Sequence, residues 1–470
     1  MTLRVQDPLW ARDGRKSRWA ARRALTGLGI SALACCVGVA AAMSIQLGAA
    51  LIAVALLCLY LWYATSHPRG AVIAMFASLV LIPVYVVPSF RSFSPQPGAV
   101  AALVVALVFV RVGVSLRLTA VDLSFGATCG AMVLAALLGP HSLLATLSEL
   151  FLWVPPYLAG RAICKRLDGA HTFALAAAFA GLISLPVIAY ETFTGHNPLF
   201  ALARPNTELT KLWAHPSLRS GGLLRTQGTF GHPLSLAVIV GSCAVFAFAL
   251  VLQTSGRRRQ VAWLLAAIGL TVGQYTSHER SGWIVLIGGL LVLAATAIPR
   301  ETRIRHAFTV AMVAVPLALL AVSASHASNG EEGVQRAESS AERIALWKHA
   351  LEPGVLAPLG LPETNTENHF TDAVRPGNTA IDSGYLQIGD VFGWIALVAL
   401  LTVVAAVVRV AVAVRGTWAA VVPAVALADL IALTVVGFQT QVPIFIWLVI
   451  GGVAGVDLRR RFHGDQPSRV

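Results

Sequence analysis

Long apolar stretches separated by short polar breaks run along most of the chain, and about fourteen of them have the length of membrane-spanning helices. Because some stretches are short for a full crossing, a count of twelve also fits. The pattern predicts an all-α, polytopic transmembrane helix bundle of about 12–14 spans, with a large loop before the last three. The predicted spans are 25–43, 47–64, 71–87, 99–114, 123–138, 143–163, 173–190, 234–252, 261–275, 283–298, 307–324, 392–408, 419–436 and 444–456.

Composition supports a membrane protein and excludes a soluble enzyme, since 57% of the residues are hydrophobic and only 12% are charged. The net charge of +13 would suggest nucleic acid in a soluble domain, but in a membrane protein basic residues chiefly set orientation. We therefore expect no nucleic-acid partner. All six cysteines lie in or beside apolar stretches without a CxxC pair, as expected for small core residues rather than disulfides or metal ligands.

The distribution of basic residues predicts which ends of the spans are cytoplasmic. If the N-terminus is cytoplasmic and the spans alternate, 25 of the 35 Lys and Arg residues fall on the cytoplasmic side. Eight of the other ten lie in two long loops, 191–232 and 325–390. We therefore expect a bacterial cytoplasmic (inner) membrane protein with both termini cytoplasmic and both long loops extracytoplasmic.

This topology divides the chain into seven parts. Within the second long loop, the segment 341–351 is amphipathic and predicts a helix that lies on the membrane surface or caps the bundle. The parts are a basic cytoplasmic N-terminus (1–24), an N-terminal transmembrane bundle (25–190), an extracytoplasmic loop (191–232), transmembrane helices of the core (233–324), a large extracytoplasmic loop (325–390), C-terminal transmembrane helices (391–457) and a cytoplasmic tail (458–470).

Three polar clusters at predicted extracytoplasmic ends could carry chemistry, whereas no nucleotide-binding or zincin motif is present. The segment 225–233 contains Arg225 and His232, and reads either as a ligand site or as a helix start with a snorkelling arginine. In 277–282, Arg280 could bind a diphosphate or pair with Glu279. In 382–387, Asp382 could be a general base or a helix N-cap.

In this order the clusters resemble the O-antigen ligase and polysaccharide polymerase family of bacterial cell-envelope glycosyltransferases, over about 225–401. The family's GTFGHP-like segment matches 228–233, and its Arg-Ser-Gly turn matches 280–282. An Arg-x-x-x-Trp-Lys pattern falls on 343–348 and a PLGLG-like turn on 358–362. The ligase signature, His followed by Asn, Ser or Gln, nine residues and then Gly, falls on Asp382, Ser383 and Gly393.

Asp382 stands at the position where ligases carry histidine. An aspartate at this position is more typical of the polymerase-like members of the family. The resemblance implies metal-independent glycosyl transfer without a cofactor, with Asp382 as base, Arg280 on the diphosphate, and His369 as another candidate base. It also implies substrate-binding roles, which we expect for Arg225, His232, Arg343, Ser383 and Tyr385.

The implied function is a polymerase of polysaccharide repeat units linked to undecaprenyl diphosphate, for exopolysaccharide, capsule or O-antigen synthesis at the outer face of the cytoplasmic membrane. One alternative is a ligase that transfers finished glycan to a lipid or other acceptor. A second alternative, from another class, is a flippase for lipid-linked oligosaccharides. Expected partners are the lipid-linked glycan, membrane lipid, and a chain-length regulator and flippase of the same pathway.

Overall fold

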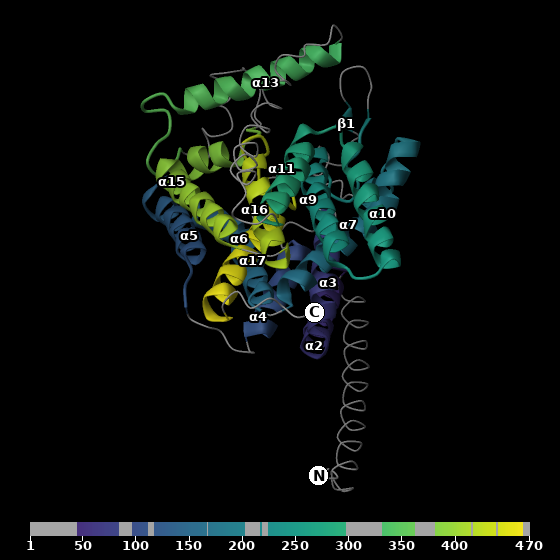
Figure 1. Cartoon of the computed structure of the whole chain (residues 1–470). Coiled ribbons are helices and arrows are strands. Elements are labelled where there is room, and N and C mark those ends of the chain that lie inside the picture. The colour runs from purple at the N-terminus through teal and green to yellow at the C-terminus, as the bar shows by residue number, and fades with distance from the viewer. Residues whose placement is uncertain are drawn as a thin grey trace, which may run out of the picture. The chain divides into compact units, whose positions relative to one another are not determined.

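The computed structural model describes residues 45–83, 96–110, 117–166, 168–202, 217–218, 224–297, 331–361, 381–414, 417–438 and 440–463 (Figure 1). These ranges contain thirteen α-helices, a short 3-10 helix and one pair of two-residue strands. The chain divides into a unit of residues 1–66, described here as helix α2, and a unit of residues 67–470 that holds all the other elements. The predicted all-α polytopic bundle is confirmed.

The elements of both units follow one another along the chain. They are α2 (Ile45–Ser66), α3 (Pro68–Leu81), α4 (Pro97–Val110), α5 (Ala120–Leu138), α6 (Leu143–Cys164), α7 (Gly169–Thr194), η2 (Pro198–Leu202), β1 (Ser217–Leu218), β2 (Leu224–Arg225), α9 (Pro233–Gln253), α10 (Arg257–Tyr275), α11 (Arg280–Ala297), α13 (Glu331–Ala350), α15 (Gly384–Ala413), α16 (Thr417–Ala432) and α17 (Val442–His463). Strands β1 and β2 pair antiparallel, with Ser217 opposite Arg225.

Twelve of the fourteen predicted spans correspond to described helices, and the spans predicted at 25–43 and 307–324 lie outside the described residues. Six of the described helices are long and apolar enough to cross a membrane. In lipid a helix satisfies its own backbone hydrogen bonds, which is why apolar runs of this length fold as helices. The chain is thus a multi-pass membrane protein.

Two described helices extend beyond their predicted spans. Helix α15 begins at Gly384, before the predicted span start at 392, because Ser383 caps it and its first turns are buried; the break at Gly393 separates these turns from the predicted span. Helix α7 continues to Thr194, so Glu191 is helical and does not begin a loop. The amphipathic segment 341–351 is helical as predicted, within the longer helix α13.

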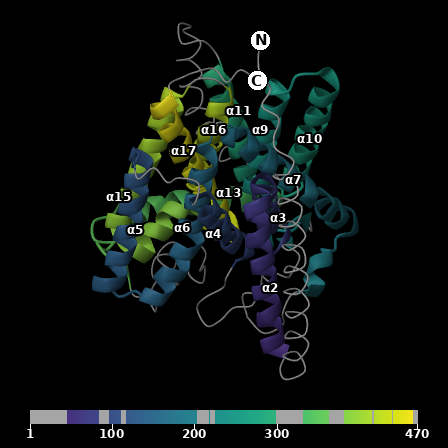
Figure 2. The ribbon, with the colours of Figure 1, turned by 90° about the horizontal axis from the view of Figure 1, so that it is seen from below.

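Helices differ in how much of their surface packs against the protein. Helices α9 and α17 are buried along most of their length, whereas α5, α6 and α15 leave many apolar side chains exposed. Seen from below, α5 lies beside α15, and α9 lies beside α10, and these pairs are in contact (Figure 2). A helix that is apolar all round suits a position inside the bundle, and exposed apolar faces suit lipid.

Glycines allow α6 and α17 to pack with their backbones in contact. A Cβ added at Gly160 would lie 1.9 Å from the backbone oxygen of Leu448, and one at Gly451 would lie 1.9 Å from that of Tyr157. Small residues four apart, such as Gly451 and Gly455, are typical of close packing between membrane helices. This contact holds α6 and α17 close together.

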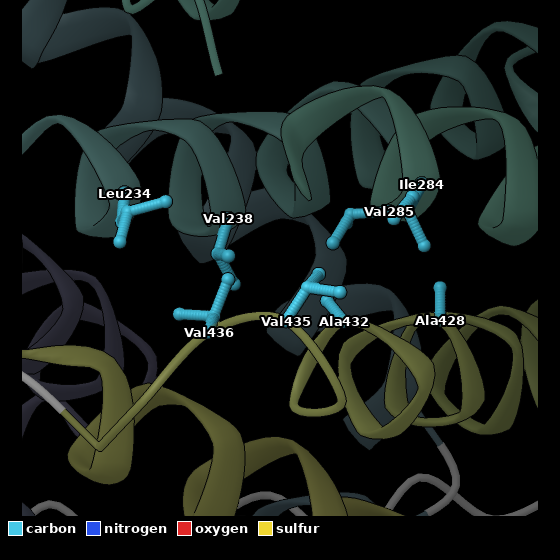
Figure 3. Close-up of a cluster of buried hydrophobic side chains, with 8 residues drawn as sticks. All are labelled: Leu234, Val238, Ile284, Val285, Ala428, Ala432, Val435 and Val436. Carbon is cyan, nitrogen blue, oxygen red and sulfur yellow. The ribbon is translucent and has the colours of Figure 1, made fainter. Parts of the chain in front are cut away.

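The segments of the three polar clusters lie at one end of the bundle, which we call the motif end and define by residues 224–232, 276–280 and 381–383. A buried apolar cluster from α9, α11, α16 and the turn after α16 lies beside it. In Figure 3, Val238 of α9 points toward Val436, while Val285 of α11 points toward Val435 and Ile284 faces Ala428 of α16. This cluster joins the helices that begin or end near the motif segments.

Helix α13 lies across the motif end of the bundle (Figure 1). Its residues Leu346 and Ala350 are buried against Ile381 and Leu386, with Trp347 packed on the same cluster. The indole Nε1 of Trp347 donates to the backbone oxygen of Thr434 at 3.4 Å. The helix therefore caps the bundle directly above the start of α15.

Candidate functional site

Arg225 joins the first two polar clusters. Its guanidinium forms an ion pair with Glu279, and these side chains are 24% and 8% exposed, respectively. One residue further on, the backbone N–H of Thr226 donates to the backbone oxygen of Thr276 at 3.2 Å. Glu279 thus holds Arg225 of strand β2 against the turn that leads to Arg280, the first residue of α11.

His232 forms the N-cap of α9, and its Nδ1 accepts the backbone N–H of Leu234 at 3.2 Å. Burial lowers the pKa of His232 to about 4; the positive charge of Arg225 acts in the same direction and the negative charge of Asp382 opposes it. The ring is therefore neutral at pH 7, and since Nδ1 accepts a hydrogen bond, the proton resides on Nε2. His232 therefore interacts electrostatically with Arg225 of its own cluster and with Asp382 of the third cluster.

Asp382 lies at the start of α15 and pairs with Arg343 of α13. The distance from Arg343 Nη2 to Asp382 Oδ2 is 3.3 Å, and the two side chains are 23% and 33% exposed. The N-cap of α15 is Ser383, whose Oγ accepts the backbone N–H of Leu386 at 3.5 Å. The alternative interpretation of Asp382 as the N-cap is wrong, because the next residue performs that role.

Backbone and hydroxyl hydrogen bonds to the end of α16 hold the first turn of α15. The N–H of Gly384 donates to the backbone oxygens of Leu433 at 2.9 Å and Val436 at 2.8 Å. Ser383 Oγ donates to the backbone oxygen of Leu433 at 3.3 Å, and Tyr385 OH donates to the backbone oxygen of Leu430 at 2.8 Å. These bonds attach the first turn of α15 to the end of α16, and the expected contact of Ser383 and Tyr385 with substrate stays a prediction.

Gly393 explains the spacing of the signature that begins at Asp382. Its φ of +86° and ψ of 169° interrupt α15, and the turn containing Gly360 inserts at this break. The N–H of Trp394 donates to the oxygen of Ala357 at 3.1 Å, and the N–H of Leu361 donates to that of Asp390 at 3.2 Å. The segment after α13 is thereby attached to the same helix that carries Asp382.

The structure therefore brings Arg225, His232, Arg343 and Asp382 to one end of the bundle, with Arg280 next in sequence to Glu279. His369 lies outside the described residues. Within the described ranges, no three His, Cys, Asp or Glu side chains gather as metal ligands.

The sequence suggested only the neighbouring Arg280 as a partner for Glu279. In the structure, Glu279 pairs with Arg225. Sequence reasoning missed a second acid, Glu191 of α7, which binds the loop after Arg225. Glu191 has no motif around it, because the backbone N–H groups that it binds, those of Gln227 and Gly228, lie more than 30 residues later in the chain. A carboxylate at the end of an apolar span was the one available signal.

Residues 264–401 match a family model described as O-Antigen ligase. The matched range contains Glu279, Arg280, Arg343, Asp382 and Gly393, while Arg225 and His232 precede it. No curated protein matches the chain. The resemblance to the O-antigen ligase and polymerase family is thereby confirmed, and the chain contains an O-antigen ligase-like region at residues 264–401.

Proposed function

We propose that the protein is a polymerase that joins polysaccharide repeat units carried on undecaprenyl diphosphate, at the outer face of the bacterial cytoplasmic membrane. The observation that carries this proposal is the grouping of two arginines, a neutral histidine and Asp382 at one end of a multi-pass bundle. The match to the O-Antigen ligase family supports glycan transfer of this general type. Both termini are cytoplasmic in this proposal.

In the reaction, a hydroxyl of the acceptor glycan attacks the anomeric carbon of the donor sugar. The bond from that carbon to the diphosphate oxygen breaks, and the lipid diphosphate leaves with the electron pair. Arg225 and Arg280 stabilise the charge that develops on the leaving group, since fixed guanidinium groups bind phosphate through parallel hydrogen bonds. This stabilisation needs no metal ion.

Asp382 takes the proton of the attacking hydroxyl. Its Oδ2 is near Arg343, so the other oxygen, Oδ1, is the acceptor in this proposal. His232 carries its proton on Nε2 and donates a hydrogen bond to a sugar or diphosphate oxygen without adding charge. Arg343, on the capping helix α13, orients the carboxylate.

A ligase is the second candidate, favoured by the description of the matching family. The aspartate at position 382, where ligases carry histidine, favours the polymerase. The deciding measurement is the size distribution of lipid-linked glycans extracted from a deletion strain. Accumulated single repeat units mean a polymerase, long chains still on the carrier mean a ligase, and an unchanged pool contradicts both.

Complementation with single variants tests the residue roles. Arg280→Ala should abolish polymer while the protein still inserts, because one guanidinium at the motif end is not needed to form the spans. Arg409→Ala, at an exposed position in the second half of α15, is the matched control and should retain polymer. Asp382→Asn should reduce polymer more than His369→Ala; the reverse order would move the base to His369.

A further inference from the structure

Glu191, in the last turn of α7, is 1% exposed, and both of its carboxylate oxygens accept hydrogen bonds. Oε1 accepts the backbone N–H of Gln227 at 3.1 Å, and Oε2 accepts that of Gly228 at 2.6 Å. The Nδ2 of Asn197 also donates to Oε2, at 2.9 Å. One side chain thus satisfies two successive backbone donors in the turn that follows Arg225.

Neighbouring contacts from the same end of α7 bind the same turn. Asn197 Nδ2 also donates to the backbone oxygen of Gly228 at 2.6 Å, and the hydroxyls of Thr192 and Thr226 lie 3.2 Å apart. Residues 226, 227 and 228 are therefore all held by residues 191–197.

The turn depends on these contacts because it is tight and buried. Gly228 has a φ of +58°, and a Cβ added there would lie 2.8 Å from Ile188 Cγ1. Without Glu191, two backbone N–H groups would be buried beside an apolar helix surface, where water could not replace the carboxylate without movement of the turn. Arg225 immediately precedes this turn, so a displaced turn moves its backbone and its guanidinium.

We infer that Glu191 is a positioning residue for glycosyl transfer, which holds the 226–228 turn so that Arg225 meets the diphosphate of the donor. The inference rests on the proposed function, since it assigns Glu191 an effect that passes through Arg225. Glu191 itself contacts no substrate.

A double-mutant cycle on the purified full-length protein in lipid nanodiscs tests this inference, with lipid-linked repeat units as substrate. Glu191→Gln keeps the shape but places an NH₂ group against backbone donors. It should lower kcat at least about tenfold with little change in KM, because the guanidinium acts in the transition state. In an Arg225→Ala background, Glu191→Gln should cost less than about threefold, because the two changes remove the same contribution.

The outcomes separate this inference from the proposed function. If the double variant loses kcat by the product of the two single-variant losses, Glu191 acts on the fold in general. That result would overturn the inference. Normal activity of Glu191→Gln beside a strongly reduced but measurable activity of Arg225→Ala would overturn the inference alone. Normal activity of Arg225→Ala would instead remove the proposed role of Arg225.

Two further variants complete the experiment. Glu149→Gln makes the same chemical change in another membrane helix, α6, and should leave kcat within about twofold of wild type. If Glu191→Gln does not fold, Asn197→Ala removes one contact to the carboxylate and one to the turn. Its smaller loss should again vanish in the Arg225→Ala background, and a multiplied loss would contradict the inference.

Discussion

Replacement of Gly393 by alanine should detach the capping segment from α15 and inactivate the protein. The φ and ψ of +86° and 169° lie in a region that is open essentially to glycine, so a side chain there costs about 1–3 kcal/mol. The new Cβ would also lie 2.2 Å from the backbone oxygen of Pro358 and 2.5 Å from the N of Gly360. Both are backbone atoms, so the turn must move.

That movement breaks the hydrogen bonds from Trp394 to Ala357 and from Leu361 to Asp390, worth about 1 kcal/mol each. The combined cost is about 3–5 kcal/mol. The purified protein should melt about 3–5 °C lower in detergent, and complementation should yield no polymer.

Gly389→Ala is the matched control for Gly393→Ala. A Cβ at Gly389 would lie 3.3 Å from Leu356 Cδ1 and from Leu397 Cδ2, which are ends of flexible side chains that can shift. This variant should melt close to wild type and retain polymer. If Gly393→Ala also melts with wild type and makes polymer, the insertion of the 357–361 turn at the helix break does not hold the site.

Two further predictions concern packing and pH. Gly451→Leu should prevent recovery of monodisperse protein by size-exclusion chromatography, because the new side chain would collide with the backbone of Tyr157. Gly288→Ala is the control and should be recovered normally, because its new Cβ would lie 3.6 Å from the Cβ of Ala428. Burial lowers the pKa of His232 to about 4, so the unfolded chain binds that proton more tightly and stability should fall as the pH drops from about 6.5 toward 4. His232→Gln should lose less thermal stability over that interval; an equal loss would contradict the assignment of the acid sensitivity to His232.

The spans could be predicted from the sequence because a long apolar run has few alternatives to a helix in lipid. The start of α15 could not, since 384–391 contain two glycines, Gln387 and Asp390 and read as loop. Their helical state depends on tertiary contacts, notably the bonds from Gly384 to the end of α16. The local pattern of apolar and polar residues does not indicate which distant segments will form such contacts.

The candidate site shows the same division. The residue types in the three clusters identified Arg225, His232 and Asp382, and the order of the motifs indicated the family. Which acid pairs with which arginine depends on how separate helices meet, so the pairing of Glu279 with Arg225 was not predictable from adjacent positions. Glu191 was missed for the same reason.

In the proposed mechanism, the ion pair between Arg225 and Glu279 affects how the donor binds. Arg225 and Arg343 are each partly buried, and a guanidinium removed from water is unfavourable unless an anion accompanies it. Before the donor binds, Glu279 supplies that charge to Arg225. In this proposal, the donor diphosphate replaces Glu279 on Arg225, so binding exchanges one anion for another on that guanidinium. In the same proposal, the extra negative charge that develops when the bond to the sugar breaks is met by Arg225 and Arg280, which favours the transition state over the bound donor.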